Sequence, residues 1–334
     1  MISILSADIG GTKTIIEHSQ YSNDKLQSTK KEKLKNTSYS CFSNMLAGFI
    51  EPDEKIDAAC FAIAGPVQNK ANCQIANVTN LPWTINNISL QESFGIPKIH
   101  LINDFQAISY AIEQLSPDDI EVLQQGLPKP NGVRAVIDAG TGLGEAIIVF
   151  NGKQYEVLAT EGGHQDFAPN STIEIELYQY IHKEHEHVSY ERILSGAGLV
   201  SIFNFLIARE KSSDQETNQQ IFNSADPATA ISQAADTKSY IIAEQALSIF
   251  MKIYGAKAGN LALACLPTAG IYITGGIARK NLSSLKSSEF IQSFNAKGRM
   301  QKILENIPVS VVINQEAGLM GATQRALNMV ITNE

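Results

Sequence analysis

Short apolar runs that lead into glycine turns open the chain and return in its second third. The first lies within residues 2–16 and turns at Gly10 and Gly11, and the second lies within residues 133–150 and turns at residues 139–144. Because β-branched residues flank the glycines, each pattern predicts a strand, a tight turn and a returning strand. We therefore predict two similar halves, each opening with a glycine-turned hairpin.

Between and after these hairpins, strand-like and helix-like patterns alternate. A weaker relative of the hairpin pattern ends in Gly275 and Gly276. Apolar runs predict buried strands at residues 58–64 and 98–102, and helical periodicity predicts helices at residues 105–115, 173–182, 199–209, 240–264 and 316–329. Strands that alternate with helices are typical of α/β proteins with mixed sheets. Two polar stretches, residues 116–132 and 210–238, are expected to be loops or surface helices.

Composition narrows the class of protein further. The 334 residues are 44% apolar and 18% charged, which suits two folded domains and excludes a disordered or fibrous chain. No apolar run approaches the ~18 residues that cross a bilayer, and the N-terminal residues lack a basic segment, so we expect a cytoplasmic protein without a signal peptide. The formal charge of −8 disfavours nucleic acid and anionic membranes as partners. No cysteine pair has the C-x-x-C spacing of a zinc or redox motif.

The first glycine turn has the residue types of a phosphate-binding loop. Gly10 and Gly11 can take positive φ and let backbone N–H groups approach an anion, and Thr12 adds a hydroxyl donor. Asp8 would repel a bare phosphate, but it could hold a magnesium ion through water. A plain hairpin turn is the alternative.

The second glycine turn repeats this chemistry. Asp138 precedes Gly140, Thr141 and Gly142 at the spacing that Asp8 has in the first turn. Two such hairpins could grip adjacent phosphates of one nucleotide, although neither matches the spacing of a Walker A or Rossmann motif. The repetition favours nucleotide binding over two unrelated turns.

Carboxylates stand at two places where chemistry could occur. Asn103 and Asp104 end a predicted strand and begin a helix, so Asp104 is either the helix N-cap or a general base at the carboxyl end of the strand. Residues 161–167 place Glu161 and His164 around two glycines, which suits a polyhydroxylated ligand better than a metal, with a plain polar loop as the alternative. Glu191 could be no more than a first-turn acid.

These blocks, in this order, resemble the bacterial glucokinases of the hexokinase–actin superfamily. The resemblance spans nearly the whole chain and rests on residues 8–12, 64–67, 79–83, 102–105, 140–144, 161–169, 189–196 and 275–277. The blocks at 161–169 and 189–196 are the most specific, because glycine hairpins are shared across the superfamily. Two departures are Lys13, where asparagine is frequent, and Asp138, where some members carry a small residue.

The resemblance implies a fold and an activity. The fold is α/β, with two domains of the hexokinase/actin-like (ribonuclease H-like) type and a cleft between them; a small domain covers residues 1–112 plus 315–334, and a large domain covers 113–314. The activity is ATP-dependent phosphorylation of D-glucose at the 6-hydroxyl, which gives glucose 6-phosphate and ADP at the first step of glycolysis. ATP and Mg²⁺ are the implied cofactors, and a homodimer is the implied assembly.

The resemblance also implies a role for each motif residue. Asp104 aligns with the catalytic base that takes the proton of the 6-hydroxyl. The residues that align with ligands of the other hydroxyls are Asn103, Glu161, His164 and Glu191. The phosphate-binding positions are Asp8, Ile9, Gly10, Gly11, Thr12, Gly140, Thr141 and Gly142, and the adenosine-side turn is Gly275 and Gly276. Asp8 and Asp138 are the candidate carboxylates for Mg²⁺, bound through water.

Three other functions remain open at this level. A kinase for another hexose, such as an N-acylated hexosamine, would use the same hydroxyl-binding residues with a different pocket at the 2-position. A sugar-sensing regulator usually adds an N-terminal DNA-binding helix-turn-helix, whereas here the first predicted strand starts at residue 2. A structural nucleotide-binding protein of actin type would leave the blocks at 161–169 and 189–196 without a purpose.

Overall fold

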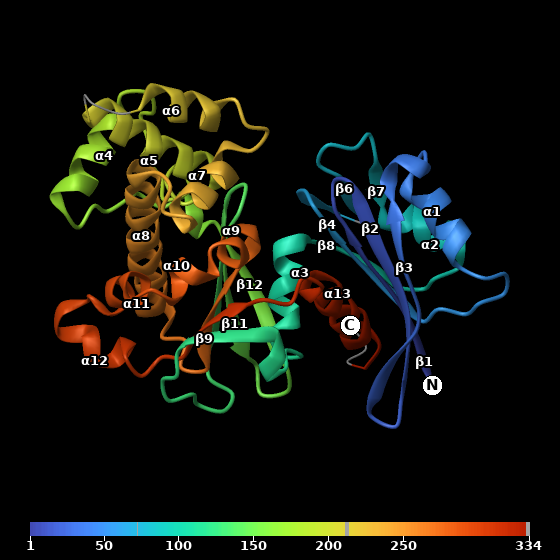
Figure 1. Ribbon diagram of the computed structural model, residues 1–334. Helices are drawn as coiled ribbons and strands as arrows, with labels where there is room; N and C mark the ends of the chain where they lie inside the picture. The colour runs from blue at the N-terminus through green and yellow to red at the C-terminus, as the bar shows by residue number, and fades with distance from the viewer. Residues whose placement is uncertain (72, 211–213, 332–334) are drawn as a thin grey trace. The chain divides into compact units, whose positions relative to one another are not determined.

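The computed structural model describes residues 1–71, 73–210 and 214–331 (Figure 1). The chain divides into two compact units. The first unit comprises Met1–Ser116 and Asn314–Glu334, and the second comprises Pro117–Ile313.

A five-stranded sheet forms the first unit, with the order β3-β2-β1-β4-β8. Its strands are β1 (Ile2–Ile9), β2 (Lys13–Ser22), β3 (Lys25–Lys35), β4 (Ala58–Ile63) and β8 (Ile99–Asn103). β1 pairs antiparallel with β2 and parallel with β4, which continues parallel to β8. The predicted opening hairpin is therefore confirmed. A small second sheet holds β5 (Val67–Lys70), β6 (Cys73–Asn77) and β7 (Thr84–Asn86).

An apolar cluster lies on each face of the inner strands of the five-stranded sheet, whereas the edge strand β3 is largely exposed. Successive side chains point to opposite faces, so Leu5 joins one apolar cluster and Ile4 joins the other. The helices of the unit are α1 (Phe42–Phe49), α2 (Asn87–Phe94), α3 (Asp104–Ala111) and α13 (Ala317–Ile331). α13 packs against α3 and β1 (Figure 1), and a Cβ atom at Gly321 would overlap the carbonyl of Ala107. The last helix of the chain therefore supports the strand and the helix that carry Asp8 and Asp104.

The second unit repeats this arrangement in a six-stranded sheet of order β12-β11-β10-β13-β14-β9. Its strands are β9 (Ile120–Gln124), β10 (Arg134–Ala139), β11 (Leu143–Phe150), β12 (Tyr155–Thr160), β13 (Gly270–Thr274) and β14 (Val309–Val312). β10 pairs antiparallel with β11 and parallel with β13, as β1 does with β2 and β4. The prediction of two similar halves is confirmed at the level of strand pairing.

A long buried helix, α8 (Ile241–Cys265), runs through the core of the second unit. The other helices are α4 (Thr172–His182), α5 (Gly196–Arg209), α6 (Gln215–Phe222), α7 (Pro227–Asp236), α9 (Gly275–Lys280), α10 (Leu282–Lys286), α11 (Ser288–Asn295) and α12 (Gln301–Leu304). α8 packs against α5, α7 and α11. No helix in the described part of the chain is long and apolar enough to cross a bilayer.

The structure corrects two expectations about secondary structure. The polar stretch 116–132 contributes strand β9, which pairs antiparallel with β14 at the sheet edge. Gly275 and Gly276 start helix α9 after β13, so the third glycine motif is a strand–helix turn and no hairpin. The stretch 210–238 contains surface helices α6 and α7, as expected, and its residues 211–213 lie outside the described residues.

Candidate active site

The turn of the first hairpin is braced by one buried asparagine. Asn36 donates its backbone N–H to the carbonyl of Thr12 (3.1 Å) and its side-chain amide to the carbonyl of Gly10 (2.8 Å). Gly10 itself donates to the carbonyl of Lys13 (3.0 Å), which closes the turn. Neither Gly10 nor Gly11 has positive φ, so that part of the sequence prediction is wrong. The turn is shaped by its hydrogen bonds, and Thr12 is exposed upon it.

Asp8 is a carboxylate with an unusual proton affinity at the end of β1. Burial and the negative charge of Asp104 raise its pKa from 3.8 to about 6. The helix α13 approaches it closely, since a Cβ atom at Gly318 would lie 3.1 Å from Asp8 Oδ2. The neighbouring Ile9 is buried, so its side chain serves the core and only its backbone can face a ligand. Asp8 therefore holds its proton to a higher pH than an ordinary aspartate.

The structure separates the roles of Asn103 and Asp104. The N-cap of α3 is Asn103, whose Oδ1 accepts the N–H of Gln106 at 2.6 Å. Asp104 is the first helical residue; its carboxylate is exposed and accepts the N–H of Phe105 at 2.9 Å. The cap interpretation of Asp104 is therefore wrong. Loss of hydration among the surrounding protein atoms raises its pKa, against the opposing hydrogen bond from Phe105, which suits a general base.

The three candidate hydroxyl-binding residues of the second unit lie together. His164 Nε2 is 3.9 Å from Glu161 Oε2, and His164 Nδ1 is 3.9 Å from Glu191 Oε1. The side chain of Glu161 is 91% exposed and that of His164 is 58% exposed, so both are free to meet a ligand. The residues come from two loops that pair through the N–H of Glu191 and the carbonyl of Gly163 (2.9 Å). This cluster presents alternating acceptors and donors, as a sugar ring requires.

Glu191 also ties this cluster to the turn of the second hairpin. Its Oε2 accepts the N–H of Leu143 at 3.0 Å, so the first-turn-acid interpretation does not describe it. A Cβ atom at Gly142 would lie 2.6 Å from that oxygen, which explains the need for glycine there. Gly140 meanwhile accepts the N–H of Gly196, the first residue of α5, at 2.9 Å. Thr141 is exposed at the tip of the turn.

Asp138 supports the strand–helix turn at the start of α9. Its Oδ2 accepts the hydroxyl of Thr274 at 2.9 Å. Gly275 has φ +93°, a conformation that favours glycine, and a Cβ atom there would overlap Asp138 Oδ1. Asp138 therefore has a structural use beside any role in metal binding.

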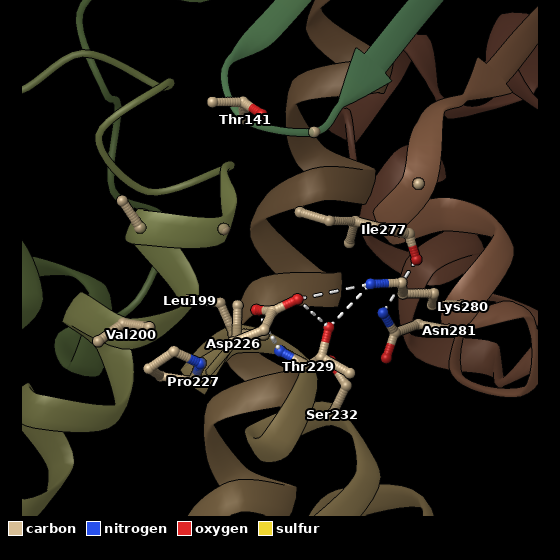
Figure 2. A pocket seen from close by; sticks show the side chains of 15 residues that line it. Thr141, Leu199, Val200, Asp226, Pro227, Thr229, Ser232, Ile277, Lys280 and Asn281 are labelled. Atoms are coloured by element: carbon tan, nitrogen blue, oxygen red, sulfur yellow. Dashed lines mark hydrogen bonds and ion pairs between the residues drawn. The ribbon is translucent and has the colours of Figure 1, made fainter. Parts of the chain in front are cut away.

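A pocket of about 570 Å³ lies beside the second hairpin, entirely within the second unit. It is lined by three residues that the sequence singled out, Gly140, Thr141 and Gly276, and by α5, α7 and α9. The apolar side chains that line it are Leu199, Val200, Pro227 and Ile277, and the polar ones include Asp226, Thr229, Ser232, Lys280 and Asn281 (Figure 2). An apolar wall with a few polar groups suits a flat heterocycle that carries polar substituents.

The polar part of the pocket is held in place by its own contacts. Lys280 Nζ donates to Thr229 Oγ1 at 2.8 Å and lies 3.6 Å from Asp226 Oδ2 (Figure 2). Asp226 also caps α7 by accepting the N–H of Thr229 at 3.1 Å. Sequence reasoning missed Asp226 and Thr229 because they fall in the polar stretch 210–238, and it missed Lys280 because helix α9, which ends at this residue, was not predicted. The available signal was the cap pair Asp226-Pro227, which marks a helix start.

No group of three or more His, Cys, Asp and Glu side chains that could hold a metal occurs within residues 1–71, 73–210 and 214–331. Asp8 and Asp138, the candidate magnesium carboxylates, are the next-to-last residues of β1 and β10, and each pairs with a residue of the returning strand of its hairpin. Carboxylates of this kind suit a cation that brings further oxygen ligands with it, such as phosphates and water.

Comparison with known proteins identifies relatives over nearly the full length. A family model described as Glucokinase matches residues 5–329. The chain is 40% identical to the glucokinase of Nostoc punctiforme, over 96% of this chain and 98% of that protein. A crystal structure of glucokinase from an Antarctic psychrotroph superposes with a TM-score of 0.84 at 28% identity, covering 98% of this chain and 99% of that one. The glucokinase of Balamuthia mandrillaris in complex with glucose shares the fold, with a TM-score of 0.73 at 22% identity, covering 98% and 94%.

Proposed function

Since the chain belongs to the glucokinase family, we propose that it transfers the γ-phosphoryl group of ATP to the 6-hydroxyl of D-glucose. The observation that carries the proposal is the state of Asp104. Its carboxylate is exposed, has a raised pKa and is not the helix cap, because Asn103 fills that position. A carboxylate at the carboxyl end of a strand, with its pKa raised by loss of hydration, is suited to accept the proton of an attacking hydroxyl.

The other candidate residues bind the hydroxyl groups of the sugar that do not react. Asn103 uses Oδ1 for the helix cap, which leaves its amide N–H₂ group to donate to a sugar hydroxyl. Glu161 and Glu191 accept hydrogen bonds from hydroxyls, and His164 donates or accepts according to its tautomer. Their contribution is to hold glucose with its 6-hydroxyl toward Asp104, because phosphoryl transfer depends mainly on positioning and on charge stabilisation.

We assign ATP to the glycine turns and to the pocket of the second unit. The turns at 10–12 and 140–142 are proposed to hold the phosphates. The adenosine moiety is proposed to occupy the pocket between Gly276 and α7, where Lys280 and Asp226 supply polar contacts. The apolar wall excludes water from the base and contributes binding energy through buried area.

Mg²⁺ is the cation we expect with ATP. Asp8 suits a magnesium site because burial and the charge of Asp104 disfavour its ionised form. A nearby cation would stabilise that form. Asp8 would hold the ion through water and Asp138 would support it from the second hairpin. The ion supplies charge neutralisation of the transferring phosphoryl group. The protein supplies the carboxylates and the backbone donors around it.

The proposal is tested by ADP release from the purified protein with a panel of sugars. We expect D-glucose to give the highest kcat/KM, with lower values for mannose, fructose and N-acetylglucosamine. A higher kcat/KM for an N-acylated hexosamine would replace glucose as the substrate. Binding of glucose by calorimetry without any ADP release would instead indicate a sugar sensor. Absence of both would leave only the actin-type nucleotide-binding function.

We also propose an oligomeric state and a cellular compartment for the protein. We expect a homodimer, which sedimentation equilibrium would test against a mass of 36.3 kDa for one chain. We also expect the cytoplasm as its compartment, where ATP and glucose meet. Fractionation of cells that express the chain at its native level would test the second expectation.

A further inference from the structure

A fully buried ion pair stands beneath the loop that carries Glu161 and His164. Lys257 of α8 and Glu145 of β11 have side chains that are 1% and 2% exposed, and Lys257 Nζ lies 2.8 Å from Glu145 Oε1. Glu145 Oε1 accepts no hydrogen bond from another group among the described residues, so the ammonium is what balances it. Burial raises the pKa of Glu145, and Lys257 opposes that rise. Apolar residues of similar volume usually serve a core at least as well as a buried ion pair.

The ammonium of Lys257 contacts three separate segments of the second unit. Besides Glu145 on β11, it donates to the side-chain oxygen of Gln165 at 2.7 Å. It also lies 4.9 Å from the ring centroid of Tyr190, a cation–π distance. Gln165 follows His164 directly, and Tyr190 precedes Glu191 directly. One buried cation therefore joins the backbones that carry two of the three candidate hydroxyl-binding residues of this unit.

The two loops are tied to each other above this cation. Tyr190 donates its N–H to the carbonyl of Gln165, and Phe167 donates to the carbonyl of Val188, both at 2.9 Å. One turn along α8 from Lys257, the amide of Asn260 donates to the hydroxyl of Tyr190 at 2.9 Å. Two polar side chains of α8, Lys257 and Asn260, thus contact the two loops.

Glu145 also sets how closely the loop that carries Glu161 and His164 packs on β11. A Cβ atom at Gly162 would overlap Glu145 Oε2, and one at Gly163 would overlap the carbonyl of Leu143. The turn Gly162–His164 therefore lies directly on β11, with the ion pair immediately below it. A change in the position of the Glu145 carboxylate would be passed to Glu161 and His164 through these contacts.

We propose that Lys257 and Glu145 are positioning residues for hexose binding: the pair holds Gln165 and Tyr190 so that His164 and Glu191 face the sugar at the required separation. The inference rests on the proposed function, because it assigns a purpose to the support of the hydroxyl-binding loops. The pair touches no substrate. Its effect is on the affinity for the sugar, and the nucleotide pocket is outside its contacts.

The test uses variants that remove the contact without leaving a lone buried charge. Gln165→Met removes the oxygen that accepts from Lys257, and Gln165→Glu keeps an acceptor there. The double variant Glu145→Gln/Lys257→Met removes both charges and leaves Gln165 in place. The matched control is Lys252→Met, which removes the ion pair between Lys252, also on α8, and Glu289 of α11 (3.0 Å), where both side chains are partly exposed.

We expect Gln165→Met and the double variant to raise the glucose KM by about tenfold or more while the ATP KM stays within twofold. Gln165→Glu should recover most of the loss, and Lys252→Met should leave both constants unchanged. Glucose dissociation constants from calorimetry should follow the KM values. Gln165→Met decides the question even if the double variant does not fold, because Gln165 is exposed at the surface.

A glucose KM within twofold of the unmodified protein in Gln165→Met would overturn the positioning role. An equal rise of the glucose and ATP constants, or a loss of thermal stability alone, would also overturn it in favour of general packing. Failure of the proposed function is seen elsewhere, in an unmodified protein that releases no ADP with glucose.

Discussion

The two glycine hairpins have the same strand pairing but different surroundings. In the first unit, the turn after β1 is braced by Asn36, and the nearby carboxylates Asp8 and Asp104 repel each other. In the second unit, the turn after β10 is bonded to Glu191 through Leu143, and it borders the pocket of about 570 Å³. The repeated element is the same, so the residues that surround each turn decide its chemistry.

This difference assigns the two units different roles in the proposed kinase, proton transfer and cation binding in the first and ligand binding in the second. The first unit contains the carboxylates that exchange a proton or meet a cation. Burial raises the pKa of both Asp8 and Asp104, and the charge of Asp104 adds to the rise at Asp8. The second unit instead contains the groups that recognise ligands by shape, because it holds a pocket and a loop cluster supported by hydrogen bonds. Substitutions of Asp8 and Asp104 in the first unit should therefore affect kcat and pH dependence, and substitutions in the second unit should affect KM.

The largest expected effect is at Asp104. Asp104→Asn should lower kcat by about 10³-fold, because a general base contributes a factor in that range. Glucose affinity, measured by calorimetry, should stay within about threefold, since the amide still forms hydrogen bonds. The exposed Asp118 offers a control, as Asp118→Asn should leave kcat unchanged. A kcat near that of the unmodified protein in Asp104→Asn would remove the first unit from the chemical step.

The second effect concerns stability at Asp8. Its pKa in the folded protein is about 6, against 3.8 for an unperturbed aspartate, so ionising it disfavours folding. This penalty is absent below pH 3.8, grows between pH 3.8 and 6, and is complete above pH 6. Asp8→Asn should therefore raise the free energy of unfolding by about 1–3 kcal/mol at pH 8, and the gain should disappear near pH 4. Urea denaturation at the two pH values measures both. An equal gain at both would show that the effect is unrelated to ionisation.

The third effect separates the two turns directly. Gly142→Ala should raise the glucose KM by about tenfold, because the new Cβ atom would lie 2.6 Å from Glu191 Oε2 and displace it. Gly11→Ala places its Cβ atom 3.4 Å from the carbonyl of Thr79, an ordinary contact, so the glucose KM should change little. Steady-state kinetics with glucose varied at saturating ATP compares the pair. Equal glucose constants in the two variants would mean that the turns do not differ as the structure indicates.

The smallest effect is expected in the pocket. Val200→Phe adds volume to the apolar wall and should raise the ATP KM by about fivefold without changing the glucose KM. Kinetics with ATP varied at saturating glucose measures it. A change in the glucose constant alone would place the sugar, and not the nucleotide, in this pocket.

Local patterns predicted much of the fold and the position of the site. The hairpins, the strand before Asn103 and the long helix α8 were visible because apolar periodicity and glycine turns depend on neighbouring residues. Strand β9 was missed because its register comes from β14, far along the chain. The helix cap at Asn103 could not be told from one at Asp104, since both side chains can cap and only the backbone dihedrals decide.

The sequence by itself determined the α/β class and, through its motif blocks, the family, because these depend on residue types in a fixed order. Only the tertiary structure decided which side chains from distant parts of the chain contact one another. It joined Glu191 to the second turn, placed Lys257 beneath Gln165 and Tyr190, and built the pocket wall from α5, α7 and α9. Contacts of that kind join residues distant in the chain, and their distances follow from how helices and strands pack, which no local pattern encodes.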